Sequence, residues 1–234
     1  MKKILLSLAL VAGTIGSVAA QGLSYGVKLG ANYANVWGKN APDSYKYKAG
    51  MLGGVAINYA FNDLASVQIE ALYSSKGFTL QDTEMTVNGI KTKYEGKFNM
   101  NYIDVPILAK IDAGPIFFEL GPQVGYLLSS NRSTDFKVKD ASGNVLAESD
   151  SEKSASALPG YAKLNSKTGG IPGFDLGMVV GVGFNVTPNV SVGVRYNAGL
   201  KTLVDTKNTS AGDEQRIFNE AFQAQLGFMF GGSR

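Results

Sequence analysis

The sequence contains no cysteine and no histidine among its 234 residues. Without cysteine, the chain has no disulfide framework, no thiol nucleophile and no thiolate zinc site. Without histidine, it lacks the usual general base of a serine hydrolase and the commonest transition-metal ligand. The charges nearly cancel, with 22 Lys and Arg against 19 Asp and Glu, so the charge balance does not favour a nucleic-acid partner. We therefore expect no cofactor, no metal site and no nucleic-acid binding.

Long apolar runs are also scarce, and the only one stands at the N-terminus. Lys2 and Lys3 precede an apolar stretch over residues 4–12, and small residues occupy the two positions that signal peptidase reads before a cleavage point. The stretch is shorter than the ~20 residues of a membrane-spanning helix. We expect a cleaved signal peptide over residues 1–20 and one mature domain over residues 21–234. An exported chain without cysteine fits a bacterium better than a eukaryotic secretory pathway.

The mature chain is dominated by alternation of apolar and polar residues with a period of two. This pattern is typical of β-strands that bury one face. Eight such rows occur, and most approach the ~9–11 residues of a tilted membrane strand. The rows cover residues 25–33, 51–61, 67–73, 103–111, 118–126, 174–184, 190–198 and 222–230.

The connections between the rows alternate in length, as in an up-and-down barrel whose tight turns share one rim. Short turns are expected at residues 62–63, 112–115 and 187–189, and long polar connections at 37–49, 77–97, 129–173 and 201–216. Within the long connections, Asn88-Gly89 indicates a hairpin tip, so the third and fourth strands should extend beyond the membrane. Residues 136–146 could form a second hairpin, and residues 149–170 have no period and indicate a mobile loop.

The polarity of the two faces separates a membrane barrel from a soluble lipocalin-like barrel, which would place its apolar residues inside. Ten glycines lie on the polar rows, and small residues suit the crowded interior of a narrow barrel. Aromatic residues stand at both ends of the apolar rows, as in the interface girdles of outer-membrane barrels. We therefore predict an all-β, eight-stranded antiparallel up-and-down transmembrane β-barrel, with short periplasmic turns and long extracellular loops.

Charged residues within the strands fall on the polar rows, and the barrel would therefore turn them into its lumen. Facing inwards, these basic and acidic side chains can pair, and Arg195 should meet Glu70 or Glu119. Such a cluster could form a proton or ion path, but an eight-stranded interior is just wide enough for side chains, which favours a structural ion network. The members of the expected network are Lys28, Glu70, Asp104, Lys110, Glu119, Asp175 and Arg195.

Several row segments also match a family pattern in order along the mature chain. They include Tyr25-Gly-Val-Lys-Leu-Gly-Ala-Asn-Tyr33, Tyr102-Ile-Asp-Val-Pro-Ile-Leu-Ala-Lys110 and Phe118-Glu-Leu-Gly-Pro-Gln-Val-Gly-Tyr126. The ordered set resembles the small outer-membrane β-barrel family of the Bacteroidetes phylum, often labelled PorT-like. The resemblance implies an eight-stranded barrel in the outer membrane but no reaction, and the family name points to a protein-secretion apparatus. It provides no binding residue for this chain.

Four functions are compatible with such a barrel. The favoured hypothesis is a non-enzymatic structural or interaction protein whose extracellular loops contact other proteins. The alternatives are an accessory of a secretion machine, a small pore, which would need ten or more strands, and a membrane enzyme using a carboxylate pair such as Glu70 with Glu119. We expect a monomer in the bacterial outer membrane, surrounded by lipid, with both termini in the periplasm.

Overall fold

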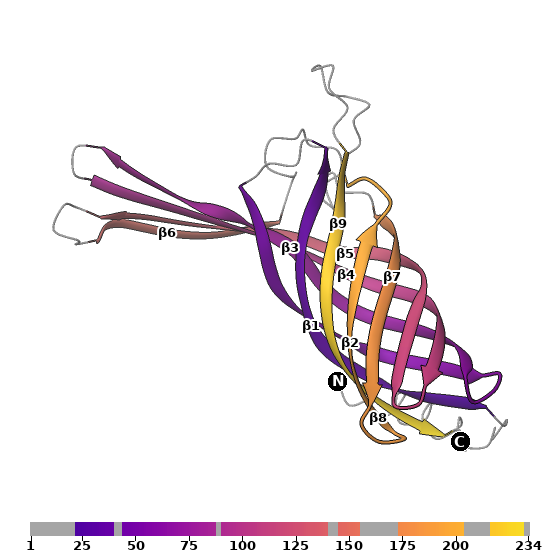
Figure 1. Ribbon diagram of the computed structural model, residues 1–234. Helices are drawn as coiled ribbons and strands as arrows, with labels where there is room; N and C mark the ends of the chain where they lie inside the picture. Colours follow the sequence, from indigo (N-terminus) through magenta and orange to yellow (C-terminus); the bar gives the residue numbers. More distant parts are fainter. Residues whose placement is uncertain are drawn as a thin grey trace, which may run out of the picture.

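The computed structural model describes residues 22–39, 44–87, 90–139, 145–154, 173–203 and 216–231. Its strands form a single antiparallel sheet that closes on itself (Figure 1). Eight strands make the ring, in the order β4-β3-β2-β1-β9-β8-β7-β5, and pairing of β4 with β5 closes it. The strands are β1 (Leu23–Lys39), β2 (Tyr45–Ala60), β3 (Ala65–Val87), β4 (Ile90–Ala113), β5 (Ile116–Lys139), β6 (Val145–Ser154), β7 (Phe174–Asn185), β8 (Val190–Gly199) and β9 (Arg216–Gly231). The eight-stranded antiparallel barrel expected from the sequence is confirmed.

Tight turns join β2 to β3, β4 to β5 and β7 to β8 at one end of the barrel, as the sequence predicts. At the first of these turns, the side chain of Asn62 accepts hydrogen bonds from the backbone N–H groups of Leu64 and Ala65. The two ends of the described chain meet at the same rim, because Ser24 pairs with Gly231. The expected signal peptide lies outside the described residues.

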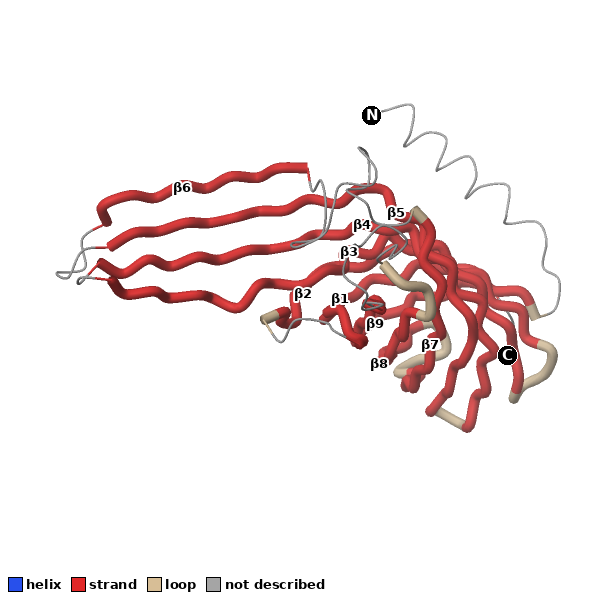
Figure 2. The backbone as a smooth tube through the Cα atoms, turned by 90° about the horizontal axis from the view of Figure 1, so that it is seen from above, coloured by secondary structure: helices blue, strands red, loops and turns tan. Residues whose placement is uncertain are grey.

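Three strands are much longer than a membrane strand requires: β3 has 23 residues, and β4 and β5 have 24 each. Their far halves leave the ring and continue, with β6 added beside β5, as a four-stranded sheet (Figures 1 and 2). We call this sheet the wing; it comprises residues 81–87, 90–97, 132–139 and 145–154.

The wing confirms the expectation that the third and fourth strands extend beyond the membrane band, up to Val87 and from Ile90. The Asn88-Gly89 tip itself lies outside the described residues. Most of residues 77–97 and 129–154 are strand, including residues 149–154, which the sequence indicated as mobile loop. Residues 155–170 of that expected loop lie outside the described part. The hairpin expected around residues 136–146 corresponds to the end of β5 and the start of β6.

Alternate residues of each strand face outward. Within the membrane band these residues are aliphatic or aromatic, so the outer wall of the barrel is apolar. Leu29, Val194 and Met51 are 57%, 57% and 67% exposed. Aromatic pairs stand at both ends of this band, Tyr25 with Phe230 near the short turns and Tyr126 with Phe174 at the opposite end. Such an aliphatic band between two aromatic girdles is the surface that a lipid bilayer covers. None of the described residues belongs to a helix long and apolar enough to cross a membrane.

Candidate functional site in the barrel lumen

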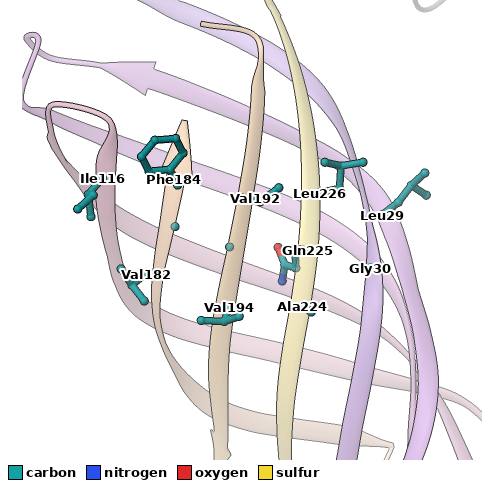
Figure 3. Close-up of a pocket in the computed structure, with 12 residues that line it drawn as sticks. Leu29, Gly30, Ile116, Val182, Phe184, Val192, Val194, Ala224, Gln225 and Leu226 are labelled. Atoms are coloured by element: carbon teal, nitrogen blue, oxygen red, sulfur yellow. The ribbon is translucent and has the colours of Figure 1, made fainter. Parts of the chain in front are cut away.

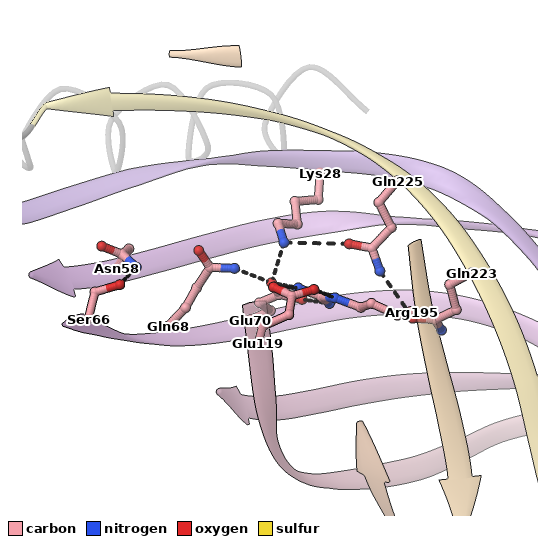
Figure 4. Close-up of polar contacts among 9 residues, drawn as sticks. All are labelled: Lys28, Asn58, Ser66, Gln68, Glu70, Glu119, Arg195, Gln223 and Gln225. Carbon is pink, nitrogen blue, oxygen red and sulfur yellow. Dashed lines mark hydrogen bonds and ion pairs between the residues drawn. The ribbon is translucent and has the colours of Figure 1, made fainter. Parts of the chain in front are cut away.

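The centre of the lumen is occupied by the guanidinium group of Arg195, which projects inward from β8 (Figure 4). It donates two hydrogen bonds to the carboxylate of Glu70 on β3, each 2.7 Å long. It also donates to both carboxylate oxygens of Glu119 on β5, through Nε and, at 2.9 Å, through Nη2. One arginine therefore connects three strands with charge-assisted hydrogen bonds, which are about twice as strong as neutral ones.

A second cation balances the cluster. The ammonium group of Lys28 on β1 lies 2.6 Å from Glu70 Oε1 and 3.5 Å from Gln225 Oε1. Gln68 donates a further hydrogen bond to Glu70. Two cations thus face two carboxylates, and all four side chains are buried. Because an unpaired buried charge is costly, each member of this balanced network stabilises the burial of the others.

Glycines on the neighbouring strand leave the space that the network fills. A Cβ atom added at Gly181 would come within 2.7 Å of Glu119 Oε1 and 2.8 Å of Arg195 Cγ. Gly183 does the same for an aromatic ring, since its added Cβ would lie 2.1 Å from Phe117 Cζ. The inward glycines therefore match the large side chains that cross the lumen.

The three other charged residues expected in the lumen are also buried, but they lie at different heights from the central network. Towards the short turns, Lys110 lies 3.6 Å from Asp112 and 4.0 Å from the centre of the Phe117 ring. Towards the wing, Asp104 lies 2.8 Å from the ammonium group of Lys76. At a similar height, Asp175 accepts a 2.8 Å hydrogen bond from Asn219, whose amide also donates to the Tyr102 hydroxyl at 3.2 Å.

An amide layer separates the central network from the Asp104–Lys76 pair. Gln225 donates to Gln223, and Gln223 donates to Asn32, at 3.1 Å and 3.0 Å. Asn32 in turn donates to the hydroxyl of Ser74 at 3.0 Å. Every one of these side chains is buried, so the polar filling of the lumen continues from the short-turn end towards the wing.

Above these polar layers, the lumen becomes apolar, which the sequence analysis missed. A buried hydrophobic cluster fills the end of the barrel nearest the wing; we call it the apolar cap. The rings of Tyr45, Phe78 and Phe98 stack in sequence, with centroids 4.2 Å and 5.2 Å apart. The apolar cap consists of Val36, Tyr45, Phe78, Phe98, Met100, Tyr102, Leu127, Leu203 and Ile217.

Leu203 comes from the segment after β8, and its backbone N–H donates to the carbonyl of Ile217 at 2.7 Å. This contact anchors the segment over the end of the barrel, and the Leu203 side chain is only 2% exposed. The lumen is therefore filled at two heights: charged and amide groups occupy its middle, and packed apolar side chains occupy its wing end.

This arrangement offers few groups for catalysis or for metal binding. Glu70 and Glu119 are both engaged by Arg195, so neither is a free acid or base in the described structure. In the part of the chain that is described, no three Asp or Glu side chains gather as a metal site would require. A hollow over β7, β8, β9 and β1 is lined mainly by apolar side chains, among them the exposed Leu29, Val182 and Val194 (Figure 3). It belongs to the apolar outer wall.

The comparison with protein families agrees with this architecture. The sequence model of a family described as "Outer membrane protein beta-barrel domain" matches residues 19–205. Solved structures similar to this chain include Ail, the attachment invasion locus protein of Yersinia pestis, with 13% identity over 90% of this chain and 99% of Ail, and a TM-score of 0.39. Neisserial surface protein A has 16% identity over 90% of this chain and all of its own, with a TM-score of 0.38.

OprG from Pseudomonas aeruginosa has 10% identity over 91% of this chain and 97% of its own, with a TM-score of 0.36. These values are too low to transfer a function from any of the three proteins. No protein with a curated description matches the sequence.

Proposed function

Since the chain belongs to the outer membrane protein beta-barrel domain family, we propose that it is a closed, non-enzymatic barrel that presents its wing at the bacterial cell surface for contacts with other proteins. The family supports a place in the bacterial outer membrane. The observation that carries the proposal is the combination of a filled lumen with a four-stranded sheet projecting from one end. A barrel with a filled lumen and a projecting sheet contacts other proteins through its outer surface and not through its lumen.

The filled lumen supports a non-conducting barrel over a small pore. An eight-stranded barrel has an interior just wide enough for its own side chains, and here both the ion network and the apolar cap occupy it. The engaged carboxylates and the absence of histidine and cysteine from the sequence support a non-enzymatic role. Among the known residue arrangements of hydrolases, the Ser-His-Asp type has no counterpart in this composition.

The wing supports a role in protein contacts because a sheet edge offers backbone groups for pairing. In the described residues, β6 pairs with β5 only, so its second edge is open. An exposed strand edge is a template for adding a strand from another chain. A secretion accessory of the PorT-like type, which the sequence resemblance suggests, would use the same surface.

The proposed orientation has both termini in the periplasm and the wing outside. It is supported by the even number of strands in the ring and by the short turns at the rim that carries both ends. The chain would act as a monomer in lipid, because its ring is closed and leaves no strand of the membrane band unpaired.

An epitope inserted in the connection between β5 and β6, residues 140–144, tests the display. The matched control carries the same epitope in the turn after β2, residues 61–64, at the opposite rim. On intact cells, antibody should label the first variant and not the second, and permeabilisation of the outer membrane should expose both. Labelling of the 61–64 variant alone on intact cells would reverse the proposed orientation and exclude surface display of the wing.

A further inference from the structure

The outer strand of the wing, β6, carries acidic residues along its open edge (Figure 2). Three of its ten residues are acids at alternate positions, so they stand on one face of the wing: Glu148, Asp150 and Glu152. The one base of this strand, Lys153, stands on the opposite face. Among the described residues β6 pairs with β5 alone, so a strand added at its second edge would place every second residue next to these acids.

The register of the wing brings acids opposite acids at one level. Glu148 is paired in register with Lys137 of β5. Asp150, in contrast, is paired with Asp135, which is paired in turn with Glu95 of β4. Three acidic residues therefore stand in one row across three neighbouring strands. Like charges directly opposite one another on a sheet are destabilising, so a cation beside Asp150 at the open edge would compensate the end of this row.

Basic residues flank this acidic row on the inner strands of the wing but not at its open edge. Two residues away from the row along their strands stand Lys93 and Lys97 on β4 and Lys137 on β5. On β6, the residues two positions away from Asp150 are Glu148 and Glu152. Negative charge is therefore concentrated on the strand that a partner would meet first.

The opposite edge of the wing is acidic as well, which disfavours a second copy of this chain as the partner. Residues 81–87 of β3 pair only with β4 in the described structure, and they include Asp82 and Glu84 but no lysine or arginine. Pairing of two wings, β6 with β6 or β6 with β3, would therefore bring acidic strands together. An antiparallel β6 pair centred on Asp150 would place Glu148 of each copy opposite Glu152 of the other. Charged edge strands are a known protection against such self-pairing.

We propose that the open edge of β6 binds an extended basic segment of another protein, which adds to the wing as a fifth strand with Lys or Arg at alternate positions. The central base stands next to Asp150, and the bases two residues before and after it stand next to Glu148 and Glu152. Backbone hydrogen bonds along the edge provide affinity, and the alternate bases provide selectivity. This inference rests on the proposed function of the wing and adds the chemistry of its partner.

Three labelled peptides, each as long as the ten residues of β6, test the proposal on the full mature chain folded in detergent. The first alternates lysine with threonine, and the second alternates glutamate with threonine. The third is the lysine peptide with every backbone amide methylated, which keeps the charge but removes the N–H donors. Fluorescence anisotropy of the label measures binding. We expect the lysine peptide to bind about tenfold more tightly than either of the others.

A pair of variants with the same change in net charge separates the edge from the rest of the surface. Asp150→Lys should weaken binding of the lysine peptide about tenfold, because it places a base opposite the central base of the added strand. Asp63→Lys, at an exposed position in the turn at the opposite rim, should leave the affinity unchanged. Gel mobility before and after boiling shows whether each variant is folded.

Four results would overturn the inference. Equal binding of the lysine peptide and its methylated form, or equal losses in the two variants, would show attraction by net charge without strand addition. Equal binding of the lysine and glutamate peptides would remove the selection for a base. Association of the unmodified protein with itself through β6 would make a second copy the partner. Absence of binding by all three peptides, with the wing labelled by antibody on intact cells, would overturn this inference and leave the proposed display of the wing standing.

Discussion

Arg195 and Glu70 form a bidentate pair across the full width of the barrel, with two hydrogen bonds of 2.7 Å. Their strands, β8 and β3, are four strands apart in either direction around the ring. The pair therefore connects opposite walls, which no backbone hydrogen bond can do. With Glu119 and Lys28 attached to the same pair, the network links four walls of the barrel at one height.

Removal of the arginine side chain should destabilise the barrel strongly. Arg195→Ala leaves the carboxylates of Glu70 and Glu119 with Lys28 as the only cation near them, and breaking a buried pair costs about 3–5 kcal/mol. Urea unfolding of the detergent-folded protein measures the loss. Lys201→Ala, at a partly exposed position after β8, is the control and should change stability by less than ~1 kcal/mol.

A substitution of Glu70, the partner of Arg195, tests whether the loss of stability comes from the ion pair between them. In the double variant Arg195→Ala with Glu70→Gln, only one of the two carboxylates is left without its arginine partner. The loss of stability should therefore be smaller than the sum of the losses in the two single variants. A coupling of about 1–3 kcal/mol is expected for residues in one network. If the two losses simply add, the pair does not act as a unit and the lumenal network contributes little to stability.

The apolar cap should behave like the core of a soluble protein. Phe98 is 1% exposed and stacks on Phe78, so Phe98→Ala leaves a cavity and should cost about 3–5 kcal/mol. Phe230→Ala, on the outer wall, is the control, because lipid can fill the space that it leaves. The same urea series measures both, and an equal cost for the two variants would show that the cap is not a packed core.

Inward glycines should differ in their tolerance of a methyl group according to their surroundings. At Gly121 an added Cβ would lie 1.9 Å from the carbonyl oxygen of Ile107, whereas at Gly193 its nearest neighbour is 3.3 Å away. Gly121→Ala should therefore destabilise the barrel by about 1–3 kcal/mol, and Gly193→Ala should change it little. Refolding yield and urea midpoint in detergent check this order; the reverse order would contradict the lumenal packing described here.

The apolar outer wall predicts how the protein behaves in solution. A surface with so many exposed aliphatic and aromatic side chains exceeds the few hundred Å² of apolar patch that a soluble monomer exposes. The chain should fold only in detergent or lipid and should migrate differently on a gel before and after boiling. A monodisperse folded protein in plain buffer would contradict the membrane location.

The sequence predicted the ring well because the outward rows carry a uniform signal. Val67, Ile69 and Tyr73 alternate with polar residues, and the strand they predict is present in β3. The pattern failed where the barrel leaves the membrane, because the polarity of the two faces is exchanged there. Glu70, Ser74 and Phe78 point to the same side of β3, yet the first two are polar and the third is part of the apolar cap.

This exchange appears in the sequence as a loss of alternation, so residues 77–97 show no apolar row and only Asn88-Gly89 indicates that the two strands continue there. The same reasoning explains the residues that were missed in the lumen. Lys76 follows the end of an apolar row, and Asn219 precedes the start of another, so neither stood within a predicted strand. Both residues would have been identified by extending the inward-facing row of each strand past the end of its apolar row and by allowing its polarity to change there.

The closed lumen is the central claim, and the conductance of single barrels in a planar lipid bilayer tests it most directly. With the ion network and the apolar cap both in place, the unmodified protein should give no stepwise conductance at voltages that leave the bilayer intact. Arg195→Ala alone should stay silent, because the apolar cap remains. Discrete current steps from the unmodified protein, reproducible from one preparation to the next, would show an open path through the barrel and contradict the account.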